Sequence, residues 1–364
     1  MRILVAPDSF KGTLTSVEVA SAIADGWRRA RPDDTIRLAP LADGGEGTLV
    51  AIEAAGGWSR RLASVHDPLG RPVRAAWLAR ADEREAVVEM AQASGLSMIR
   101  PGQRDAWLAT SVGTGDMLRT VVDAGIRDVV MGIGGSATTD GGAGLLRGLG
   151  AAVSEDLGTI DLEDLDPRLI EVSLRVASDV TNPLLGPTGA AAVYGPQKGA
   201  TPELVERLDA RLARFADALS AATRRDERAT TGAGAAGGVG FALLSLAARF
   251  QSLELVPGID LVMAAAGFHA ALAETDLVIT GEGRVDEQTA FGKTAMGVAI
   301  RARAAGVRCL AIGGTVTPEG RDALAAVGAE AVGAHDGPIT LDDARAAGVA
   351  PIEAAATHAA RTLT

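Results

Sequence analysis

The sequence predicts an α/β protein of two domains, and three observations support this. Short apolar runs alternate with helix-forming segments near both ends of the chain, a pattern typical of parallel strands joined by helical crossovers. The 364 residues exceed one ordinary core and fit two domains of roughly 100 to 200 residues. Apolar residues make up 47% and charged residues 22%, with 45 glycines, so we expect a globular chain and not a disordered one.

The two ends of the chain predict alternating strands and helices. At the N-terminus, an apolar run at 3–7 precedes a loop at 8–12, a helix after Thr15 and a second strand at 35–39. Thr15 and Glu18 have capping-box spacing, which supports the helix start. The C-terminal portion repeats the pattern, with strands expected at 307–312 and 329–332 and helices at 295–303, 318–326 and 351–362.

The middle of the chain begins differently, with several strands in succession. These are expected at 58–65, 73–79 and 86–90, separated by turn signals such as Asp67-Pro68-Leu69-Gly70. Further along, the Thr201-Pro202 pair is typical of an N-cap and a first helical residue. The remaining elements expected here are helices at 105–123, 202–222 and 237–248 and strands at 128–133, 172–177 and 276–280.

The simplest plan places the two ends of the chain in one domain. Residues 1–60 and 290–364 would form a Rossmann-like parallel-sheet domain, and residues 61–289 a second α/β domain inserted into it. Open α/β sheets bind their ligands beyond the carboxyl ends of the strands. We therefore expect an active site in the cleft between the two domains.

Net charge, apolar runs and cysteine content limit which partners the protein could bind and where in the cell it is expected. A formal net charge of −11 argues against nucleic acid or an anionic membrane as the main partner, because both demand a large basic face. The opening apolar run is too short for a secretory signal, and no apolar stretch of about 18 residues follows. Cys309 is the only cysteine, which is typical of a reducing compartment. We expect a soluble, cytoplasmic protein, and the sequence gives no indication of its oligomeric state.

Five loops combine glycines with charged or hydroxyl side chains. In the first, Asp8, Ser9 and Lys11 lie between a strand and a helix start, where an anion can bind side-chain charge and backbone N–H groups; a simple capped connection explains it equally well. In the second, Asp43-Gly44-Gly45-Glu46-Gly47-Thr48, two carboxylates stand beside three glycines. They could contact a metal or a substrate, or only favour the dipole of the next helix.

The third loop is the richest in glycine and runs from Gly132 to Gly142. Its glycines permit close backbone approach, and hydroxyl and carboxylate groups stand among them, which suits a phosphate or carboxylate ligand. The residues expected to bind there are Gly134, Gly135, Ser136, Thr138 and Asp140. Gly132, Gly134 and Ala137 also match the dinucleotide pattern G-x-G-x-x-G/A, which makes an NAD-dependent oxidoreductase a rival; against it, Asp140-Gly141-Gly142 interrupts the helix that such a motif requires.

The fourth and fifth loops add possible metal and phosphate ligands. In the fourth, Asp179 and Asn182 follow a strand and could bind Mg²⁺ or a hydroxyl, while Lys198 could offset phosphate charge; an ordinary turn is as good an explanation. The fifth follows the strand at 276–280 and has no P-loop spacing, but a lysine and hydroxyls at a helix start suit phosphate. Its residues of interest are Gly281, Glu282, Asp286, Thr289, Lys293 and Thr294.

Taken together and in order, these loops resemble those of the type I glycerate kinase family over almost the whole chain. The matching segments are APDSFKG at 6–12, PLADGGEGT at 40–48, GIGGSATTDGGAG at 132–144, SDVTNPLLG at 178–186, GPQKGA at 195–200 and DLVITGEGRVDEQT at 276–289. The resemblance implies ATP-dependent phosphorylation of D-glycerate, in bacterial members usually at the 2-hydroxyl. It also implies two α/β domains, one inserted into a Rossmann-like domain.

Under this resemblance, phosphoryl transfer needs charge neutralisation and an acceptor for the hydroxyl proton. Lys11, Lys198 and Lys293 become candidates for binding phosphate or the glycerate carboxylate. The carboxylates of Asp179, Asp286 and Glu282 are candidates for Mg²⁺ or the proton, and the catalytic set is Asp8, Lys11, Asp179, Asp286 and Lys293. A non-catalytic glycerate-responsive binding protein is a further alternative, which the intact Asp and Lys residues of the five loops disfavour.

Overall fold

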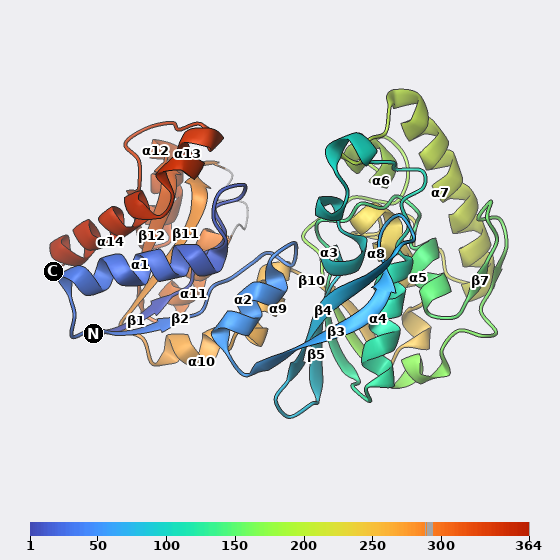
Figure 1. Cartoon of the computed structure of the whole chain (residues 1–364), viewed down its shortest axis with the longest axis horizontal. Coiled ribbons are helices and arrows are strands. Elements are labelled where there is room, and N and C mark those ends of the chain that lie inside the picture. The colour runs from blue at the N-terminus through green and yellow to red at the C-terminus, as the bar shows by residue number, and fades with distance from the viewer. Residues whose placement is uncertain (288, 290–293, 364) are drawn as a thin grey trace. The chain divides into compact units, whose positions relative to one another are not determined.

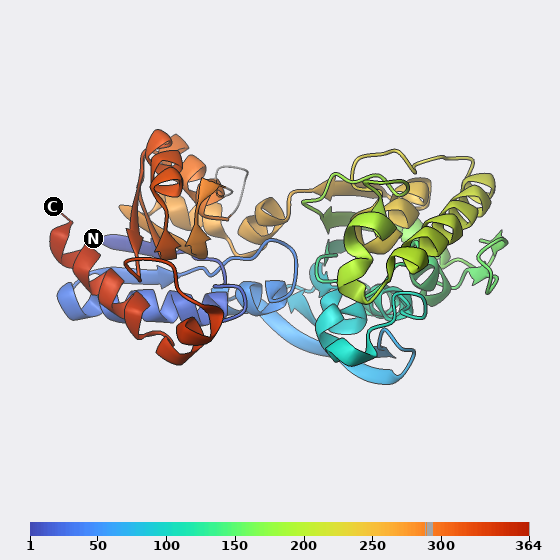
Figure 2. The same ribbon diagram turned by 90° about the horizontal axis from the view of Figure 1, so that it is seen from above.

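The computed structural model describes residues 1–287, 289 and 294–363, and the chain in it divides into two compact units. Unit 1 comprises Met1–Asp43, Val50–Gly56 and Val262–Thr364, and unit 2 comprises Gly44–Leu49 and Gly57–Leu261. The ribbon views show the elements of each unit (Figures 1 and 2). Within the described residues, no helix combines the length and the apolar character needed to span a membrane.

Unit 1 is built on a five-stranded sheet in the order β13-β12-β11-β1-β2, in which every adjacent pair is parallel. Its strands are β1 (Arg2–Val5), β2 (Thr35–Leu38), β11 (Leu277–Val285), β12 (Arg308–Val316) and β13 (Ala329–Gly333). In chain order this is the doubly wound arrangement 2-1-3-4-5. The strand order reverses between β1 and β11, and ligands bind at such switch points.

Helices cover both faces of this sheet. They are α1 (Ser16–Ala30), α10 (Phe268–Ala273), α11 (Thr294–Ala304), α12 (Pro318–Ala326), α13 (Leu341–Ala347) and α14 (Ala350–Thr362). α1 packs on α14, and a Cβ at Gly26 would lie 2.3 Å from the carbonyl oxygen of Glu353, so only glycine permits this approach. Figure 2 shows α1 and α14 on one face of the sheet and α11 and α12 on the other.

The local signals at the chain ends are confirmed. Thr15 and Glu18 form the expected reciprocal capping box, and α12 and α14 begin and end within one residue of the expected bounds. One expectation was wrong: the strand expected at 276–280 belongs to this sheet, because β11 pairs with β1 and β12, and not to the inserted portion. An apolar run indicates a strand, but its partner depends on the register of distant segments.

Unit 2 contains a six-stranded sheet in the order β10-β9-β6-β5-β4-β3. Its strands are β3 (Trp58–His66), β4 (Pro72–Arg80), β5 (Glu85–Glu89), β6 (Asp128–Gly132), β9 (Ser173–Ala177) and β10 (Ser252–Val256). The strands β10, β9, β6 and β5 are parallel, whereas β4 and β3 form an antiparallel edge. β7 (Ala152–Val153) and β8 (Ile160–Asp161) form a small separate ribbon. The predicted mixed α/β fold with parallel sheets is confirmed.

The α-helices of unit 2 are α3 (Ala91–Ser94), α4 (Val112–Asp123), α5 (Ala143–Gly148), α6 (Ala190–Tyr194), α7 (Pro202–Thr223) and α8 (Val239–Ser245). Its 3₁₀ turns are η1 (Leu96–Met98), η2 (Pro101–Gln103), η3 (Pro167–Glu171), η4 (Pro196–Lys198), η5 (Ala235–Gly238) and η6 (Ala247–Arg249). Two further helices, α2 (Thr48–Ala55) and α9 (Gly258–Ala265), have residues in both units.

The helices expected at 202–222 and 105–123 had different outcomes. The first is α7, with Thr201 as its N-cap. The second begins only at Val112, because the Asp105 carboxylate accepts hydrogen bonds from the N–H groups of Trp107 and Leu108 and forms a turn instead.

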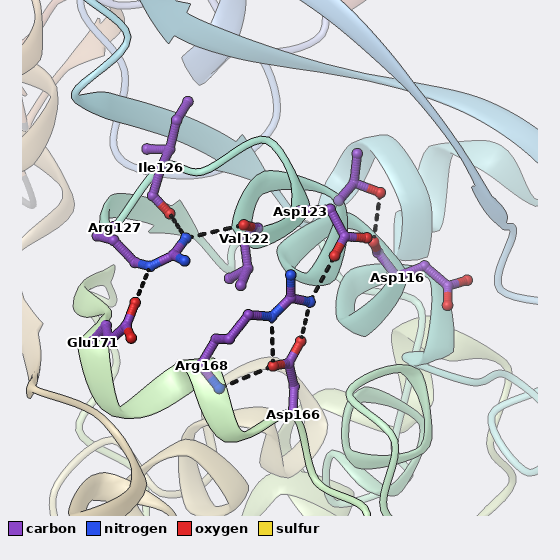
Figure 3. Close-up of polar contacts among 9 residues, drawn as sticks. Asp116, Val122, Asp123, Ile126, Arg127, Asp166, Arg168 and Glu171 are labelled. Atoms are coloured by element: carbon purple, nitrogen blue, oxygen red, sulfur yellow. Dashed lines mark hydrogen bonds and ion pairs between the residues drawn. The ribbon is translucent and has the colours of Figure 1, made fainter.

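Exposed ion pairs tie α4 to η3 at the surface of unit 2 (Figure 3). Arg168 donates to Asp166 and to Asp123, the last residue of α4. Arg127 donates to Glu171 and to the carbonyl oxygens of Val122 and Ile126. Among the described residues this network shares no member with the five loops, so it supplies control positions below.

Candidate functional site

In unit 1, a group of charged and hydroxyl side chains lies at the switch point between β1 and β11. Asp8 follows β1, and its N–H donates to the carbonyl oxygen of Gly281 in β11 at 2.9 Å. The buried Asp8 carboxylate accepts hydrogen bonds from the Ser9 N–H at 2.6 Å and from the Thr294 hydroxyl at 2.6 Å. Ser9, expected to bind substrate, contributes its backbone to this arrangement.

Opposite charges face each other in the same group. The ammonium of Lys11 lies 2.7 Å from the carboxylate of Asp43. Burial opposes the charge on Lys11, but attraction to Asp43, Asp8 and Glu282 outweighs it and raises the pKa of the lysine. Burial raises the pKa of Asp8, with a further contribution from Asp43, against the hydrogen bond from Thr294 and the attraction of Lys11. Folding thus keeps a poorly solvated carboxylate beside an ammonium.

The fifth loop continues this group. Glu282 is buried in β11 and accepts a hydrogen bond from the hydroxyl of Thr289, which in turn accepts one from the N–H of Asp286 at 3.0 Å. The carboxylate of Asp286 pairs with Arg284 at 3.2 Å. The predicted catalytic residue Lys293 lies outside the described residues. Unit 1 therefore brings together Asp8, Lys11, Asp43, Glu282, Thr289 and Thr294, here called the switch-point cluster.

In unit 2, four parallel strands end at one edge of the sheet. The register places Glu89, Gly132, Ala177 and Val256 beside one another at the ends of β5, β6, β9 and β10. The second, third and fourth loops meet at this edge. The carbonyl oxygen of Gly44 accepts a hydrogen bond from Gly134 at 3.3 Å, and the carboxylate of Asp179 accepts one from Gly258 at 2.9 Å.

The second loop fits closely against the strand ends. Gly44 has φ +85°, and a Cβ there would lie 2.5 Å from the Cβ of Ala177, so this position requires glycine. Gly45 accepts hydrogen bonds from the N–H and the hydroxyl of Thr48, at 3.3 and 2.7 Å. Glu46 is exposed. The loop therefore combines a closely packed backbone with the exposed residue Glu46.

The third loop is held from inside by a buried lysine. The ammonium of Lys198, a residue 2% exposed, donates to the hydroxyl of Ser136 at 3.0 Å and to the carbonyl oxygen of Thr138 at 2.5 Å. Burial lowers the pKa of Lys198 to about 7, against the attraction of Asp140. Lys198, expected to neutralise phosphate, contacts the loop directly. Gly135 lies at the exposed side of this loop with φ +72°.

Asp140 and Asn182 have their polar atoms engaged within the protein. The buried Asp140 carboxylate accepts hydrogen bonds from the N–H and hydroxyl of Ser111 and from the N–H groups of Gly142 and Gly144, where α5 begins. The side-chain amide of Asn182 donates to Thr188, and its oxygen accepts from the hydroxyl of Tyr194. Both residues were expected to bind substrate or phosphate. These hydrogen bonds join them to other residues of the same chain.

Comparisons with known proteins agree over the whole chain. The Glycerate kinase family profile matches residues 3–364. A Glycerate kinase from Bacillus subtilis (strain 168) is 43% identical over 87% of this chain and 86% of its own length, and the Glycerate 2-kinase of Escherichia coli (strain K12) is 41% identical over 88% and 86%. The chain belongs to the glycerate kinase family.

A solved structure supports the same membership. The crystal structure of a protein from Salmonella typhimurium LT2, described as a glycerate kinase 2, matches with a TM-score of 0.85 and 42% identity. The match covers 100% of this chain and 98% of that one. The family resemblance expected from the loops is therefore confirmed.

The oxidoreductase interpretation is not supported. A dinucleotide fingerprint requires a helix that opens within the glycine pattern, so that its N-terminus faces the pyrophosphate. Here Gly132 ends β6, and α5 begins only at Ala143 after a loop that includes Gly135, Gly141 and Gly142 at positive φ. The glycines of this glycerate kinase family member build a long loop and not the strand-to-helix turn of a Rossmann nucleotide site.

Sequence reasoning did not assign a role to the buried side chains of Glu89 and Ser111, which contact the second and third loops. Glu89 ends β5 and accepts hydrogen bonds from the second loop, and Ser111 donates to Asp140. Glu89 stands at the end of an apolar run, Val87-Val88-Glu89-Met90, and an acidic residue at the end of a buried strand was the available signal.

Proposed function

We propose that this chain transfers the γ-phosphoryl group of ATP to the 2-hydroxyl of D-glycerate and forms 2-phosphoglycerate and ADP. The relatives named Glycerate kinase and Glycerate 2-kinase, with identities of 43% and 41%, support this activity. The switch-point cluster carries the proposal in physical terms, because it holds Lys11 against Asp43 at the position where open α/β sheets bind ligands.

The reaction sets the roles. A bond forms between the oxygen of the glycerate 2-hydroxyl and the γ-phosphorus of ATP. The bond between the γ-phosphorus and the β,γ-bridging oxygen breaks, and ADP leaves with that oxygen. The hydroxyl proton passes to a carboxylate, for which Asp8, Asp43 and Glu282 are candidates in unit 1. Lys11 and Lys293 would neutralise phosphate or carboxylate charge.

Mg²⁺ belongs to the same proposal. In the part of the chain that the structure describes, no three His, Cys, Asp or Glu side chains are grouped to hold a metal ion. This fits a nucleotide-bound Mg²⁺, which takes one or two protein carboxylates together with phosphate oxygens and water. We propose Asp179 and Asp286 as its protein ligands, because carboxylate oxygens are the ligands that Mg²⁺ takes alongside phosphate oxygens. The ion would offset phosphate charge. Cytoplasmic location stays a prediction.

Phosphorus NMR of the product tests the activity. Purified protein with Mg²⁺-ATP and D-glycerate should give 2-phosphoglycerate, which is distinguished from the 3-phosphate by its phosphorus–proton coupling. Exclusive 3-phosphate would overturn the proposed regiochemistry. No phosphoglycerate, with glycerate binding retained, would favour the binding-protein alternative, and consumption of NADH would revive the oxidoreductase.

A further inference from the structure

Glu89 is a buried glutamate that none of the proposed catalytic steps uses. It is the last residue of β5 and is 0% exposed. Burying an unpaired carboxylate is costly, so such a group is normally held by several donors. Burial raises the pKa of Glu89, Glu46 raises it further, and hydrogen bonds from Leu49, Gly47 and the Gln92 side chain act in the opposite direction.

The donors come mainly from the second loop. One carboxylate oxygen of Glu89 accepts the N–H of Gly47 at 3.2 Å, and the other accepts the N–H of Leu49 at 3.0 Å. These N–H groups flank Thr48, the first residue of α2. The first N–H groups of a helix have no acceptor within it and carry the positive end of its dipole. An internal anion therefore occupies the start of α2.

Only a carboxylate satisfies both donors. An apolar side chain of the same size would leave two buried N–H groups without an acceptor. Glutamine would offer one oxygen, and its NH₂ group would face the other N–H donor. Aspartate would keep two acceptor oxygens but would be one methylene shorter. Glutamine and aspartate at position 89 therefore distinguish two requirements. Glutamine keeps the volume of glutamate but loses the charge and one acceptor oxygen, whereas aspartate keeps the charge and both oxygens but has a smaller volume.

The loop that Glu89 holds is in close contact with neighbouring strand ends. The carbonyl oxygen of Gly44 accepts a hydrogen bond from Gly134, and a Cβ at Gly132 would lie 2.5 Å from that oxygen. A Cβ at Gly44 would lie equally close to the Cβ of Ala177. The loop therefore touches the ends of β6 and β9 while Glu89 anchors it to the end of β5. Glu46 lies on this segment.

A direct chemical role for Glu89 does not fit these contacts. Both oxygens engage backbone donors, and the side chain has no exposed surface from which to reach a substrate. The same contacts occupy the N–H groups of Gly47 and Leu49. The action of Glu89 is exerted through the loop.

We propose that Glu89 is a positioning residue for phosphoryl transfer, whose carboxylate fixes the segment 44–49 against the strand ends of unit 2 and so sets the placement of Glu46. This inference rests on the proposed function. Reactions that depend on positioned charges lose rate when the supporting group is displaced by a fraction of an ångström. The residues that face the Glu89 carboxylate are Glu46, Gly47, Leu49 and Gln92.

The first test does not depend on activity. Hydrogen exchange measured by mass spectrometry on the whole chain should show faster exchange in peptides covering 44–52 for Glu89→Gln than for wild type, with Glu89→Asp intermediate. Glu206→Gln, which changes an exposed glutamate of α7 in the same way, should leave these peptides unchanged. Unchanged exchange in both Glu89 variants would overturn the anchoring role.

The second test is kinetic and uses the same proteins. Glu89→Gln should lower kcat at least tenfold with a smaller change in KM for ATP, and Glu89→Asp should recover part of the loss. Equal activity in the glutamine variant, or glutamine outperforming aspartate, would contradict the proposal, because volume and not acceptor number would then matter. If Glu89→Gln does not fold, the comparison of wild type with Glu89→Asp tests the proposal in both the exchange and the kinetic measurements. If wild type has no kinase activity, the proposed function is wrong. The hydrogen-exchange result still tests whether Glu89 anchors the segment 44–49.

Discussion

The hydroxyl of Thr294 donates a hydrogen bond of 2.6 Å to the carboxylate of Asp8, although 286 positions separate the two residues. Thr294 is the first residue of α11, and Asp8 follows β1. This bond joins a helix start to the strand end at the point where the order of the parallel sheet reverses. Burial raises the pKa of Asp8, which means that its charged form destabilises the folded protein. We therefore expect the charge that the proposed function needs to reduce the stability of the protein at this position.

Asp8→Asn should therefore raise stability and lower activity. A carboxyl group whose pKa is raised in the folded state binds protons more tightly when folded. Its unfavourable contribution to stability therefore appears as the pH rises above the ordinary aspartate pKa of 3.8. Asparagine has no such titration. The variant should unfold at a higher temperature than wild type at pH 8, with a smaller difference at pH 4, and turnover should fall by about a hundredfold.

The control for this prediction is Asp25→Asn, which changes an exposed aspartate of α1. It should keep normal turnover and show no comparable pH-dependent gain. A less stable Asp8→Asn at pH 8 would mean that the hydrogen bonds from Thr294 and Ser9 outweigh the cost of burying the charge.

Lys11→Ala should abolish most activity with little effect on stability. Its partner Asp43 is 2.7 Å away, but their side chains are 75% and 40% exposed, and such pairs contribute about 0–1 kcal/mol to folding. Loss of a cation that offsets phosphate or carboxylate charge should lower kcat/KM by at least about a hundredfold. Steady-state kinetics and thermal unfolding measure the two effects.

Arg2→Ala is the matched control, because Arg2 forms an exposed ion pair with Asp276 in the same unit. It should leave kcat/KM unchanged. Near-normal turnover of Lys11→Ala would show that the lysine is a surface charge and that the first loop is a simple capped connection.

Lys198→Met should change stability in a pH-dependent way. Burial lowers the folded pKa of Lys198 to about 7, whereas the ordinary pKa of a lysine is 10.5. The unfolded chain therefore binds more protons between these two pH values, and wild-type stability rises with pH in this window. Methionine removes the titration. The unfolding temperature of the variant relative to wild type should therefore be higher at pH 6.5 than at pH 9.5.

The size of the Lys198 effect is on the order of a few kcal/mol. Arg249→Met, which removes an exposed cation of unit 2, should show the same difference from wild type at both pH values. A Lys198→Met difference that does not vary with pH would show that the lysine keeps an ordinary pKa. In that case its bonds to Ser136 and Thr138 are made by a charged ammonium throughout.

Asp140→Ala should destabilise the protein. Removing this carboxylate leaves the buried donors of Ser111, Gly142 and Gly144 without an acceptor, which costs about 1–3 kcal/mol for each unsatisfied group. We expect a thermal midpoint several degrees lower. Arg168→Ala, in the exposed network of Figure 3, should shift it far less. Normal stability with lost glycerate or ATP binding would instead restore Asp140 to the ligand site.

Much of the fold was predictable because its signals are local. The capping box of Thr15 and Glu18 and the Thr201-Pro202 start of α7 are recorded in adjacent residues. Hydrophobic periodicity and helix caps involve residues only a few positions apart, so they can be found from the spacing of residue types in the sequence. The turn at Asp105 was missed because a side-chain acceptor competed locally with the helix.

The sequence by itself determined many of the elements and the loops that carry charged groups, and with them the family. Only the tertiary structure decided that β11 pairs with β1, which brings Glu282 and Asp8 to one switch point, and that Lys198 is buried. Strand partners and burial depend on contacts between residues far apart in the chain. A side chain's neighbours, and therefore its pKa and its role, are set by that packing and leave no trace in the residues beside it.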